Sequence, residues 1–503
     1  MKFPFEKLAL LNVPISHLVM DSRAIQLGDT FVACPGEKID GRQFIPAVIE
    51  KGANAVIWES QHFTWRDAWH IPNLGVVDLR HKIGWLADKV SGSPSKNLWS
   101  VGVTGTNGKT SVCHWVAQAL SDNASLCAMI GTLGNGFSDK LQASINTTPD
   151  AISVHAMLAD YLRGGAKAVA MEVSSHALVQ GRVCGVRFDV AVLTNLSRDH
   201  LDYHGDMESY AASKRKLFEW KQLKYAVLNL DDEFGAELAM HLQGETVEVI
   251  GFGMSDTAMQ FAGKLGIRMV YGNLSEMNEH GLQLDIHTSW GGARLSSALI
   301  GRFNAANLLA VLAVLLVSDI SLNEAVASLS RVKAVDGRMQ RFGSAQQPMV
   351  IVDYAHSPDA LEKVLLGIRE IRKPQANKQY SGKLICVFGC GGDRDRGKRA
   401  MMGKVAERFS DYCIITSDNP RSENPHAIIA DVVSGMSSGN HEIIVDRASA
   451  IQGAIHDAQQ SDIVLIAGKG HEAYQEINGI KHPFSDAQVA LQALKNRRFG
   501  VCA

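Results

Sequence analysis

The run from Val101 to Thr110, VGVTGTNGKT, restricts the possible folds of this chain more than any other segment. An apolar strand leads into a glycine turn, and a helix beginning at Ser111 follows. Backbone N–H groups of such a turn, together with the helix N-terminus, bind phosphate oxygens. Lys109 would reach the terminal phosphates and the Thr110 hydroxyl would hold Mg²⁺. The run departs from the general G-x-x-x-x-G-K-T pattern at Val103, and a tight turn without a ligand is the alternative.

Apolar strands alternate with helical segments over most of the chain, which predicts an α/β protein. A Ser/Gly/Pro stretch at residues 91–95 and the run at residues 335–338 mark two boundaries. We therefore expect three domains, at residues 1–97, 98–335 and 336–503. The central one is predicted to be a P-loop ATPase with a mainly parallel sheet, and the last a Rossmann-like domain. The pattern predicts strands at 168–173, 190–194, 225–228, 349–352, 383–388, 411–416 and 463–467, antiparallel strands within 280–300, and a helix at 301–317.

Charge and composition argue against several classes of function. The 503 residues include 50 Lys plus Arg and 52 Asp plus Glu, a net charge of -2 that gives no reason to expect nucleic acid or an anionic membrane as partner. We expect no signal peptide, and no apolar stretch reaches the roughly 20 residues that cross a bilayer. The eight cysteines are scattered without a pairing pattern, which predicts buried thiols in a reducing compartment. We therefore expect a cytoplasmic enzyme.

Two strands of the central region end in side chains that suit a metal site. One leads to Glu172, and the other leads to a polar run that contains His200. A P-loop enzyme needs acidic ligands for Mg²⁺ at strand ends, so both are candidates beside Thr110. For Glu172, a cap on the next helix is an equal alternative. The spacing of His200 and His204 also permits zinc, but only with further ligands that the sequence does not show.

Seven short motifs follow one another along the chain: TTPD at 147–150, EVSSH at 172–176, NLSRDHLD at 195–202, GRFNAAN at 301–307, GRM at 337–339, DYAH at 353–356 and GKGHE at 468–472. Their order resembles that of the Mur ligases of bacterial cell-wall synthesis, over essentially the whole chain. The resemblance implies a domain for UDP, a central ATPase, and a mobile C-terminal domain for the incoming amino acid.

The resemblance also assigns residues to sites. For ATP these are Gly105, Thr106, Asn107, Gly108, Lys109, Thr110, Asn304, Arg338 and Asp353. For the UDP-sugar and its peptide they are Ser22, Glu37, Lys38, Ile39, Thr147, Thr148, Ser174, Gln180 and Arg182. For the incoming amino acid, diaminopimelate, they are Arg394, Asp418, Asn419, Pro420, Arg421, Gly468 and Glu472. For catalysis and the metal they are Lys109, Thr110, Glu172, His200 and Lys214.

Lys214 aligns with the lysine that is carbamylated in this family. A carbamate would convert a cation into an oxygen ligand for a second Mg²⁺. From the residues alone, a lysine on the surface of a helix is the simpler interpretation.

The run Asp418-Asn419-Pro420-Arg421 has the form found in diaminopimelate-adding members, whereas lysine-adding relatives lack the arginine. Diaminopimelate differs from lysine by one carboxylate, and a guanidinium binds a carboxylate through two hydrogen bonds. Without that carboxylate Arg421 and Arg394 would be unpaired, which costs on the order of 3–5 kcal/mol for a buried charge. Glu472 would pair with the distal ammonium of diaminopimelate. A simple turn is the alternative interpretation.

The implied reaction adds meso-diaminopimelate to UDP-N-acetylmuramoyl-L-alanyl-D-glutamate in peptidoglycan precursor synthesis. The D-glutamate side-chain carboxylate attacks the γ-phosphorus of ATP, and the amine then displaces phosphate from the acyl phosphate. We expect ATP as substrate, Mg²⁺ as cofactor, and a monomer that binds neither nucleic acid nor membrane. The alternatives are a lysine-adding ligase, a folate polyglutamylating ligase, and a P-loop kinase or motor.

Overall fold

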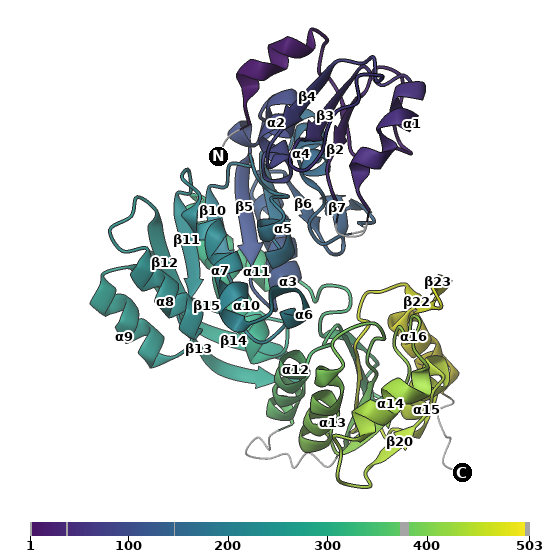
Figure 1. Cartoon of the computed structure of the whole chain (residues 1–503). Coiled ribbons are helices and arrows are strands. Elements are labelled where there is room, and N and C mark those ends of the chain that lie inside the picture. The colour runs from purple at the N-terminus through teal and green to yellow at the C-terminus, as the bar shows by residue number, and fades with distance from the viewer. Residues whose placement is uncertain (1–2, 37–38, 145, 373–381, 498–503) are drawn as a thin grey trace.

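The computed structural model describes residues 3–36, 39–144, 146–372 and 382–497, which form three units along the chain (Figure 1). The N-terminal unit has a four-stranded parallel sheet in the order β1-β2-β3-β4. Its elements are β1 (Leu18–Val19), β2 (Thr30–Ala33), β3 (Ala55–Glu59), β4 (Asn73–Val76), α1 (Ile45–Glu50), α2 (Ile83–Val90) and the 3-10 helices η1 (Phe5–Leu11), η2 (Gly41–Phe44), η3 (Leu79–His81) and η4 (Pro94–Asn97).

The central unit is built on an eleven-stranded sheet in the order β15-β14-β13-β12-β11-β10-β5-β9-β6-β7-β8. The strands from β13 to β6 run parallel, and antiparallel strands extend both edges. Its strands are β5 (Trp99–Thr104), β6 (Cys127–Gly131), β7 (Gly134–Phe137), β8 (Lys140–Gln142), β9 (Ala168–Glu172), β10 (Val190–Leu193), β11 (Tyr225–Asn229), β12 (Glu248–Gly253), β13 (Arg268–Asn278), β14 (Gly281–Thr288) and β15 (Gly291–Ser297). Its helices are α3 (Lys109–Asp122), α4 (Ala151–Arg163), α5 (Ser175–Val179), α6 (Leu201–His204), α7 (Met207–Arg215), η5 (Lys216–Glu219), α8 (Glu233–His241), α9 (Asp256–Leu265), α10 (Arg302–Val317) and α11 (Leu322–Ser330).

The C-terminal unit has a six-stranded sheet in the order β16-β17-β21-β18-β19-β20, parallel except for β16. A separate hairpin, β22 with β23, follows it. Its elements are β16 (Gln340–Phe342), β17 (Met349–Asp353), β18 (Leu384–Phe388), β19 (Tyr412–Ile415), β20 (His441–Ile443), β21 (Ile463–Ala467), β22 (Tyr474–Ile477), β23 (Ile480–Pro483), α12 (Pro358–Ile371), α13 (Gly397–Phe409), α14 (Pro425–Val433), α15 (Arg447–Asp457) and α16 (Asp486–Asn496).

The position of β5 creates the crevice in which the site lies. β5 lies between β9 and β10, and the chain leaves it through α3 to β6 on one side and later returns to β10 on the other. Ligands bind at such a reversal of strand order, beyond the carboxyl ends of the strands. The loops that follow β5, β9 and β10 therefore meet at one edge of the sheet.

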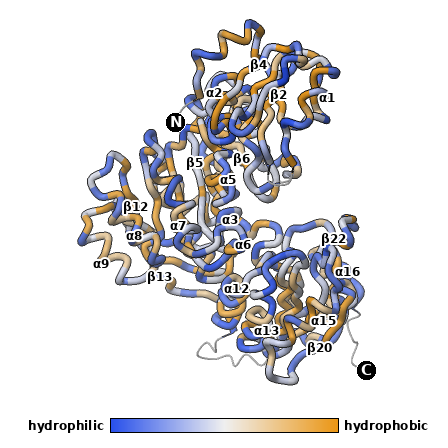
Figure 2. The backbone as a smooth tube through the Cα atoms, in the orientation of Figure 1, coloured by the Kyte–Doolittle hydropathy of each residue, from blue (hydrophilic) through white to orange (hydrophobic). Residues whose placement is uncertain are grey.

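Apolar segments lie mainly in the strands and in the helices that cover them (Figure 2). Helix α10 is buried along nearly its whole length, because it packs against the central sheet and α3. In the described part of the chain, no helix is both long and apolar enough to cross a bilayer. The seven cysteines in that part are free thiols, and Cys502 lies outside it.

The predicted α/β class and the predicted strands are confirmed. The antiparallel strands within 280–300 are β14 and β15, and the helix at 301–317 is α10. One prediction is wrong in detail: the helix after the glycine turn begins at Lys109 rather than Ser111, with Gly108 as its N-cap. The domain boundaries at 97 and 335 stay predictions.

A buried ion pair fixes the end of β21, which leads directly to Gly468. Arg447 and Asp486 are both fully buried, and two hydrogen bonds of 2.7 and 2.8 Å join them. The same guanidinium donates to the carbonyl of Ala467, at the end of β21, over 3.0 Å. A buried charge that loses its partner has no water to replace it, so this pair holds the loop after β21 in place.

We predict that Asp486→Ala lowers the free energy of unfolding by about 3–5 kcal/mol, because Arg447 then stays buried without its partner. Asp285→Ala is the matched control, since it breaks an exposed ion pair with Arg294 and should cost at most about 1 kcal/mol. Urea unfolding followed by circular dichroism measures both. Equal effects of the two substitutions would contradict the prediction.

Candidate active site

The phosphate loop, residues 104–110, depends on two glycines that no other residue could replace. Gly105 has φ +144°, and a Cβ there would lie 1.9 Å from Thr194 Oγ1. Gly108 has φ +88°, and a Cβ there would lie 2.5 Å from Asn307 Oδ1. The loop after β10 and helix α10 therefore both press against the phosphate loop. Asn307 was not among the predicted site residues, although it belongs to the same motif as Asn304.

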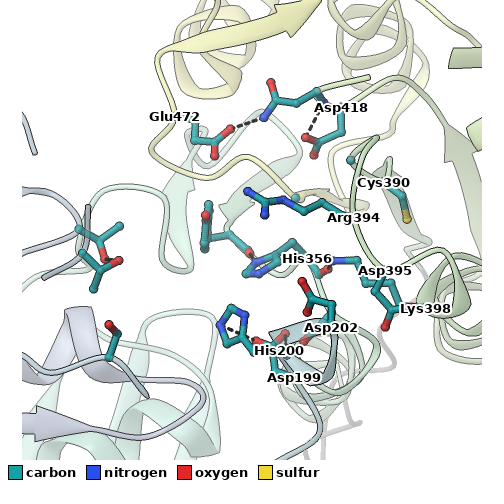
Figure 3. Close-up of a pocket in the computed structure, with 18 of the residues that line it drawn as sticks. Asp199, His200, Asp202, His356, Cys390, Arg394, Asp395, Lys398, Asp418 and Glu472 are labelled. Atoms are coloured by element: carbon teal, nitrogen blue, oxygen red, sulfur yellow. Dashed lines mark hydrogen bonds and ion pairs between the residues drawn. The ribbon is translucent and has the colours of Figure 1, made fainter. Parts of the chain in front are cut away.

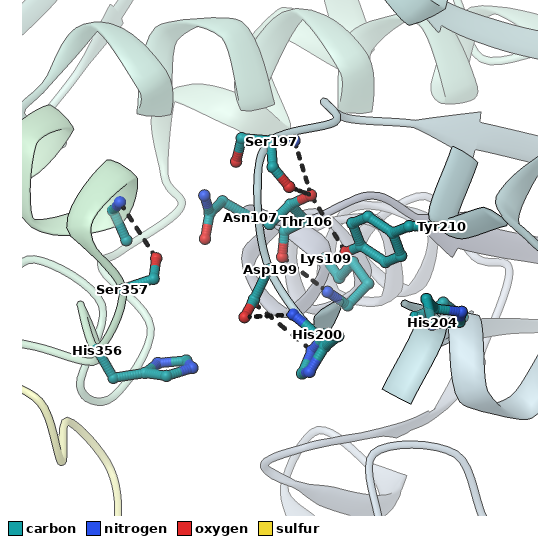
Figure 4. Close-up of polar contacts among 12 residues, drawn as sticks. Thr106, Asn107, Lys109, Ser197, Asp199, His200, His204, Tyr210, His356 and Ser357 are labelled. Atoms are coloured by element: carbon teal, nitrogen blue, oxygen red, sulfur yellow. Dashed lines mark hydrogen bonds and ion pairs between the residues drawn. The ribbon is translucent and has the colours of Figure 1, made fainter. Parts of the chain in front are cut away.

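Two lysine side chains donate to one carbonyl oxygen at this loop. Lys109 Nζ donates to the carbonyls of Gly105 and Thr106, each over 2.9 Å. Lys214 Nζ donates to the same Gly105 carbonyl over 2.9 Å and lies 4.5 Å from the centre of the Tyr210 ring. Figure 4 shows Lys109 beside Thr106, Tyr210 and His200. In this conformation the Lys109 ammonium is turned back onto its own loop.

Lys214 is not a surface residue, so the simpler interpretation of its sequence position is wrong. It is 1% exposed. Burial, and then the nearby charge of Lys109, lower the pKa of Lys214 well below its usual value. A neutral amine is the form that reacts with carbon dioxide, so this environment favours the carbamate that the family resemblance implies.

Thr110 and Glu172 come together as a pair of oxygen donors. Thr110 Oγ1 donates to Glu172 Oε2 over 3.0 Å, and Thr132 donates to the same carboxylate through its N–H and its hydroxyl. Glu172 is 2% exposed and does not cap the following helix, whose cap is Ser174. Hydroxyl and carboxylate oxygens are the ligands that Mg²⁺ prefers. This pair therefore fits a magnesium ion beside the phosphate loop.

His200 is the residue before helix α6 and lies beside Lys109 (Figure 4). Burial lowers its pKa to about 4, so its ring is neutral near pH 7. Its Nε2 is 3.6 Å from Asp199 Oδ2. Burial opposes ionisation of Asp199, yet His200, His356 and Lys398 together hold the Asp199 pKa below its usual value.

The alternative of a zinc site built on His200 and His204 gains no support. Both rings pack against His176, with ring centres 5.0 and 5.5 Å apart. Among the described residues, no three His, Cys, Asp or Glu side chains are grouped so that they could hold a metal ion. His204 donates to or accepts from Ser175 Oγ over 3.0 Å instead.

The residues predicted for the peptide of the substrate form one hydrogen-bonded group. Arg182 donates to the Thr148 carbonyl over 2.8 Å and to Gln180 Oε1 over 2.8 Å. The Ser174 N–H donates to Thr148 Oγ1 over 3.2 Å. Thr147 Oγ1 lies 3.1 Å from Thr132 Oγ1, and because the Thr132 hydroxyl gives its one proton to Glu172, Thr147 is the donor of this pair. Their role in binding stays a prediction.

Of the residues predicted for adenosine, Arg338 contacts the phosphate loop directly. Arg338 donates to Thr110 Oγ1 over 3.2 Å, and its buried Nε has no acceptor among the described residues. Asp353 accepts from the N–H groups of Met339 and Ala355, and burial raises its pKa. Asn304 is buried and donates to the Ile300 carbonyl over 2.8 Å.

The residues predicted for UDP belong to the N-terminal unit. Ser22 is half-buried, and its carbonyl accepts from Lys51 over 2.7 Å. Ile39 is 59% exposed. Glu37 and Lys38 lie outside the described residues.

One cavity of about 1220 Å³ connects three of the predicted sites. From the central unit it is lined by Lys109 and His200, and from the peptide group by Thr147, Thr148, Ser174 and Arg182. From the C-terminal unit it is lined by Arg394, Asp418, Asn419, Arg421, Gly468 and Glu472. Pro420 is buried and does not line it. Figure 3 shows Arg394 and His356 directed into the cavity, with Glu472 and Asp418 at one end and His200 at the other.

The predicted diaminopimelate residues surround a glycine. Gly468 has φ +117°, and a Cβ there would lie 2.6 Å from Asp418 Oδ2. Glu472 Oε2 accepts from Asn419 Nδ2 and from Lys469 Nζ, both over 2.8 Å. The buried Lys469 was not predicted, and it fixes the orientation of the Glu472 carboxylate.

The expectation that Arg421 is unpaired without diaminopimelate is wrong. Arg421 Nε lies 3.3 Å from Glu476 Oε2, and its guanidinium donates to the Gly392 carbonyl over 2.7 Å. Its side chain is 21% exposed, so solvent also reaches it. Arg394, by contrast, is exposed at the cavity. The free-energy cost of leaving Arg421 without the diaminopimelate carboxylate is therefore smaller than the sequence suggested.

His356 belongs to the DYAH motif at 353–356 and lines the cavity, but it was not among the predicted site residues. Its Nδ1 lies 2.8 Å from the Tyr354 carbonyl, and because a carbonyl only accepts, Nδ1 carries the proton. Burial lowers the His356 pKa, so Nε2 keeps a free lone pair. Lys398 donates to the His356 carbonyl over 2.9 Å and fixes the segment.

Comparisons with known proteins decide the family. The Mur ligase family catalytic domain matches residues 14–90, the Mur ligase middle domain residues 103–315, and the Mur ligase glutamate ligase domain residues 337–470. The chain belongs to the Mur ligase family.

Two relatives of this Mur ligase are each named UDP-N-acetylmuramoyl-L-alanyl-D-glutamate–2,6-diaminopimelate ligase. The protein from Chromobacterium violaceum is 50% identical over 485 residues, which are 96% of this chain and 95% of the relative. The protein from Nitrosomonas europaea is 50% identical over 488 residues, 96% of this chain and 94% of the relative. A solved structure of a ligase with the same name is 36% identical, with a TM-score of 0.67 over 96% of this chain and 95% of that chain.

We predict that Lys214→Ala reduces turnover of this Mur ligase by at least about a hundredfold, because the carbamate that the family resemblance implies at this lysine could no longer form. Short carboxylic acids such as acetate should restore part of the activity, since they can occupy the space of the carbamate. The matched control is Lys216→Ala, which removes an exposed lysine close by and should leave turnover unchanged. Near wild-type activity of Lys214→Ala without acid would show that Lys214 has no catalytic role.

Proposed function

We propose that this chain uses ATP to join meso-diaminopimelate to UDP-N-acetylmuramoyl-L-alanyl-D-glutamate, in the synthesis of peptidoglycan precursors. The carboxylate that becomes the amide is that of the D-glutamate side chain. The name shared by full-length relatives at 50% identity supports this reaction.

One observation carries the proposal: a single cavity reaches from the phosphate-loop lysine to the basic and acidic side chains of the C-terminal unit. Lys109 and His200 line it from the central unit, and Arg394, Asp418 and Glu472 line it from the C-terminal unit. A kinase or motor has no use for an amino-acid site opposite its phosphate loop. A ligase needs both, because the amine has to reach the activated carboxylate while water is excluded.

Activation precedes amide formation because a carboxylate is a poor electrophile. The carboxylate oxygen attacks the γ-phosphorus of ATP, ADP leaves, and the acyl phosphate forms. Lys109 leaves the loop carbonyls and neutralises charge on the transferred phosphoryl group. A magnesium ion held by Thr110 and Glu172, with His200 and carbamylated Lys214 at a second position, would supply further positive charge.

The amine then attacks the acyl carbon and phosphate departs. The neutral ring of His356 faces the cavity and offers Nε2 as an acceptor for the proton that the ammonium has to lose. Glu472 and Asp418 suit the distal ammonium, and Arg394 with Arg421 suits the distal carboxylate. Lysine lacks this carboxylate and would leave Arg394 without a partner.

The folate alternative is less well supported. Folylpolyglutamate synthase of Mycobacterium tuberculosis shares the fold at 16% identity and a TM-score of 0.56, over 76% of this chain. The match to the diaminopimelate ligase structure spans 96% of this chain. We further propose that the enzyme acts in the cytoplasm as a monomer and depends on Mg²⁺.

The direct test is ATP-dependent ligation with purified protein. The UDP-dipeptide, ATP and Mg²⁺ are incubated with meso-diaminopimelate, L-lysine or L-glutamate in turn, and the product is identified by mass spectrometry. A folate substrate with L-glutamate forms the parallel assay. We expect amide formation only when diaminopimelate is combined with the UDP-dipeptide, and none with L-lysine, with L-glutamate or with the folate substrate.

We predict that Lys109→Ala leaves the fold intact and lowers ligation by at least about a hundredfold, because the γ-phosphate loses its main side-chain cation. Phosphate release measures the ligation rate, and circular dichroism measures whether the fold is intact. Lys167→Ala removes an exposed lysine ahead of β9 and serves as control. Ligation close to wild type in Lys109→Ala would show that the phosphate assignment is wrong.

We predict that Arg421→Ala lowers kcat/KM for diaminopimelate by about tenfold to a hundredfold, the effect of losing a hydrogen bond to a charged group. The KM for ATP should stay unchanged, and good lysine use need not appear, since removing a donor does not build a complementary pocket. Arg396→Ala is the matched control, because Arg396 is 72% exposed and pairs with Glu423 outside the cavity. Equal use of lysine and diaminopimelate by the wild type would refute the specificity.

A further inference from the structure

Asp359 connects the C-terminal unit to the phosphate loop. It is the second residue of α12, and the cap of that helix is Ser357, whose Oγ accepts from the Ala360 N–H. The Asp359 carboxylate therefore does not serve as the cap of its own helix. It reaches the central unit instead.

One oxygen of this carboxylate binds two loops of the central unit. Asp359 Oδ2 accepts from Ser197 Oγ over 2.7 Å and from Asn107 Nδ2 over 3.1 Å. Asn107 lies in the loop after β5, and Ser197 lies in the loop after β10, the neighbouring strand. A single side chain of the C-terminal unit thus contacts both loops at the carboxyl edge of the central sheet.

The two donors are themselves joined to the phosphate loop. The Ser197 N–H donates to Thr106 Oγ1 over 3.0 Å, and this hydroxyl donates to the Ser197 carbonyl over 3.1 Å. The Asn107 N–H donates to Asn195 Oδ1 over 3.0 Å. Figure 4 shows Ser197, Thr106 and Asn107 next to one another beside Lys109. A displacement of α12 would therefore change the positions of the phosphate-loop residues beside Lys109.

We propose that Asp359 is a positioning residue that couples docking of the C-terminal unit to the geometry of the phosphate loop. The inference rests on the proposed ligase function. Without docking, Asn107 and Ser197 lose this acceptor, and the cavity is open on the side that brings the amine. Water then attacks the acyl phosphate and returns the carboxylate and phosphate, so ATP is used without amide formation.

The exposure of the contact suits a reversible coupling. The Asp359 side chain is 31% exposed, and Lys363, 44% exposed, donates to the same oxygen over 3.0 Å. Water competes for partly exposed hydrogen bonds of this kind, so each is weak on its own. The contact biases the docked arrangement and still breaks when product leaves.

The test uses the full-length chain with ATP, the UDP-dipeptide and diaminopimelate. Asp359→Ala is expected to lower kcat by about tenfold, with little change in the KM for ATP. The ratio of phosphate released to amide formed should rise above that of the wild type. Asp359→Asn keeps an oxygen acceptor and should recover most of both properties. Lys363→Ala is the matched control, because it removes the exposed ion pair and leaves the bonds to Asn107 and Ser197.

A double-mutant cycle with Ser197→Ala separates coupling from helix stability. Ser197→Ala removes the hydroxyl and keeps the backbone bonds to Thr106. The double substitution should therefore lower kcat by less than the two single effects combined, because both remove the same hydrogen bond. Unchanged kcat and stoichiometry in Asp359→Ala, or full additivity in the cycle, would overturn the inference. A wild-type chain that forms no amide would overturn the proposed function instead.

Discussion

The carbonyl oxygen of Gly105 accepts hydrogen bonds from Lys109 and Lys214, and the active site is arranged around this contact. Two ammonium groups at one oxygen repel each other, and burial removes the water that would screen them. Lys214 is the more deeply buried, so it is the one whose charge is least favourable. The close approach requires a glycine, because Thr194 Oγ1 occupies the place of a Cβ.

Two kinds of acceptor are available to Lys109: the carbonyls of its own loop and the phosphate oxygens of the proposed nucleotide. The loop carbonyls accept from the Lys109 ammonium, so this buried cation has hydrogen-bond partners. Phosphate oxygens are stronger acceptors than carbonyls and would draw Lys109 away. The Gly105 carbonyl then has only Lys214 to bind, and the repulsion between the two lysines is relieved.

The sequence predicts local features well and long-range partners poorly. Apolar runs and the glycine turn locate the strands and the phosphate loop, because both depend on neighbouring residues. The burial of Lys214 depends on Tyr210 and Gly105, and a helix with few apolar residues gives no sign of it. The pairing of Arg421 with Glu476 arises because the hairpin of β22 and β23 folds back beside the loop after β19. The motif spanning 353–356 was visible, but nothing local shows that Asp359, three residues later, meets Asn107 across two units.

The contacts described between the central and C-terminal units are partly exposed and individually weak. Residues of both units line the cavity, so a change in the spacing of the units changes the shape of the cavity. Arg302 pairs with Glu370 at 59% and 28% exposure, and Asp359 is 31% exposed. Exposed pairs contribute about 0–1 kcal/mol each, and a few of them hold the units together without preventing release. The buried pair of Arg447 with Asp486 lies instead inside the C-terminal unit, where the same guanidinium fixes the end of β21.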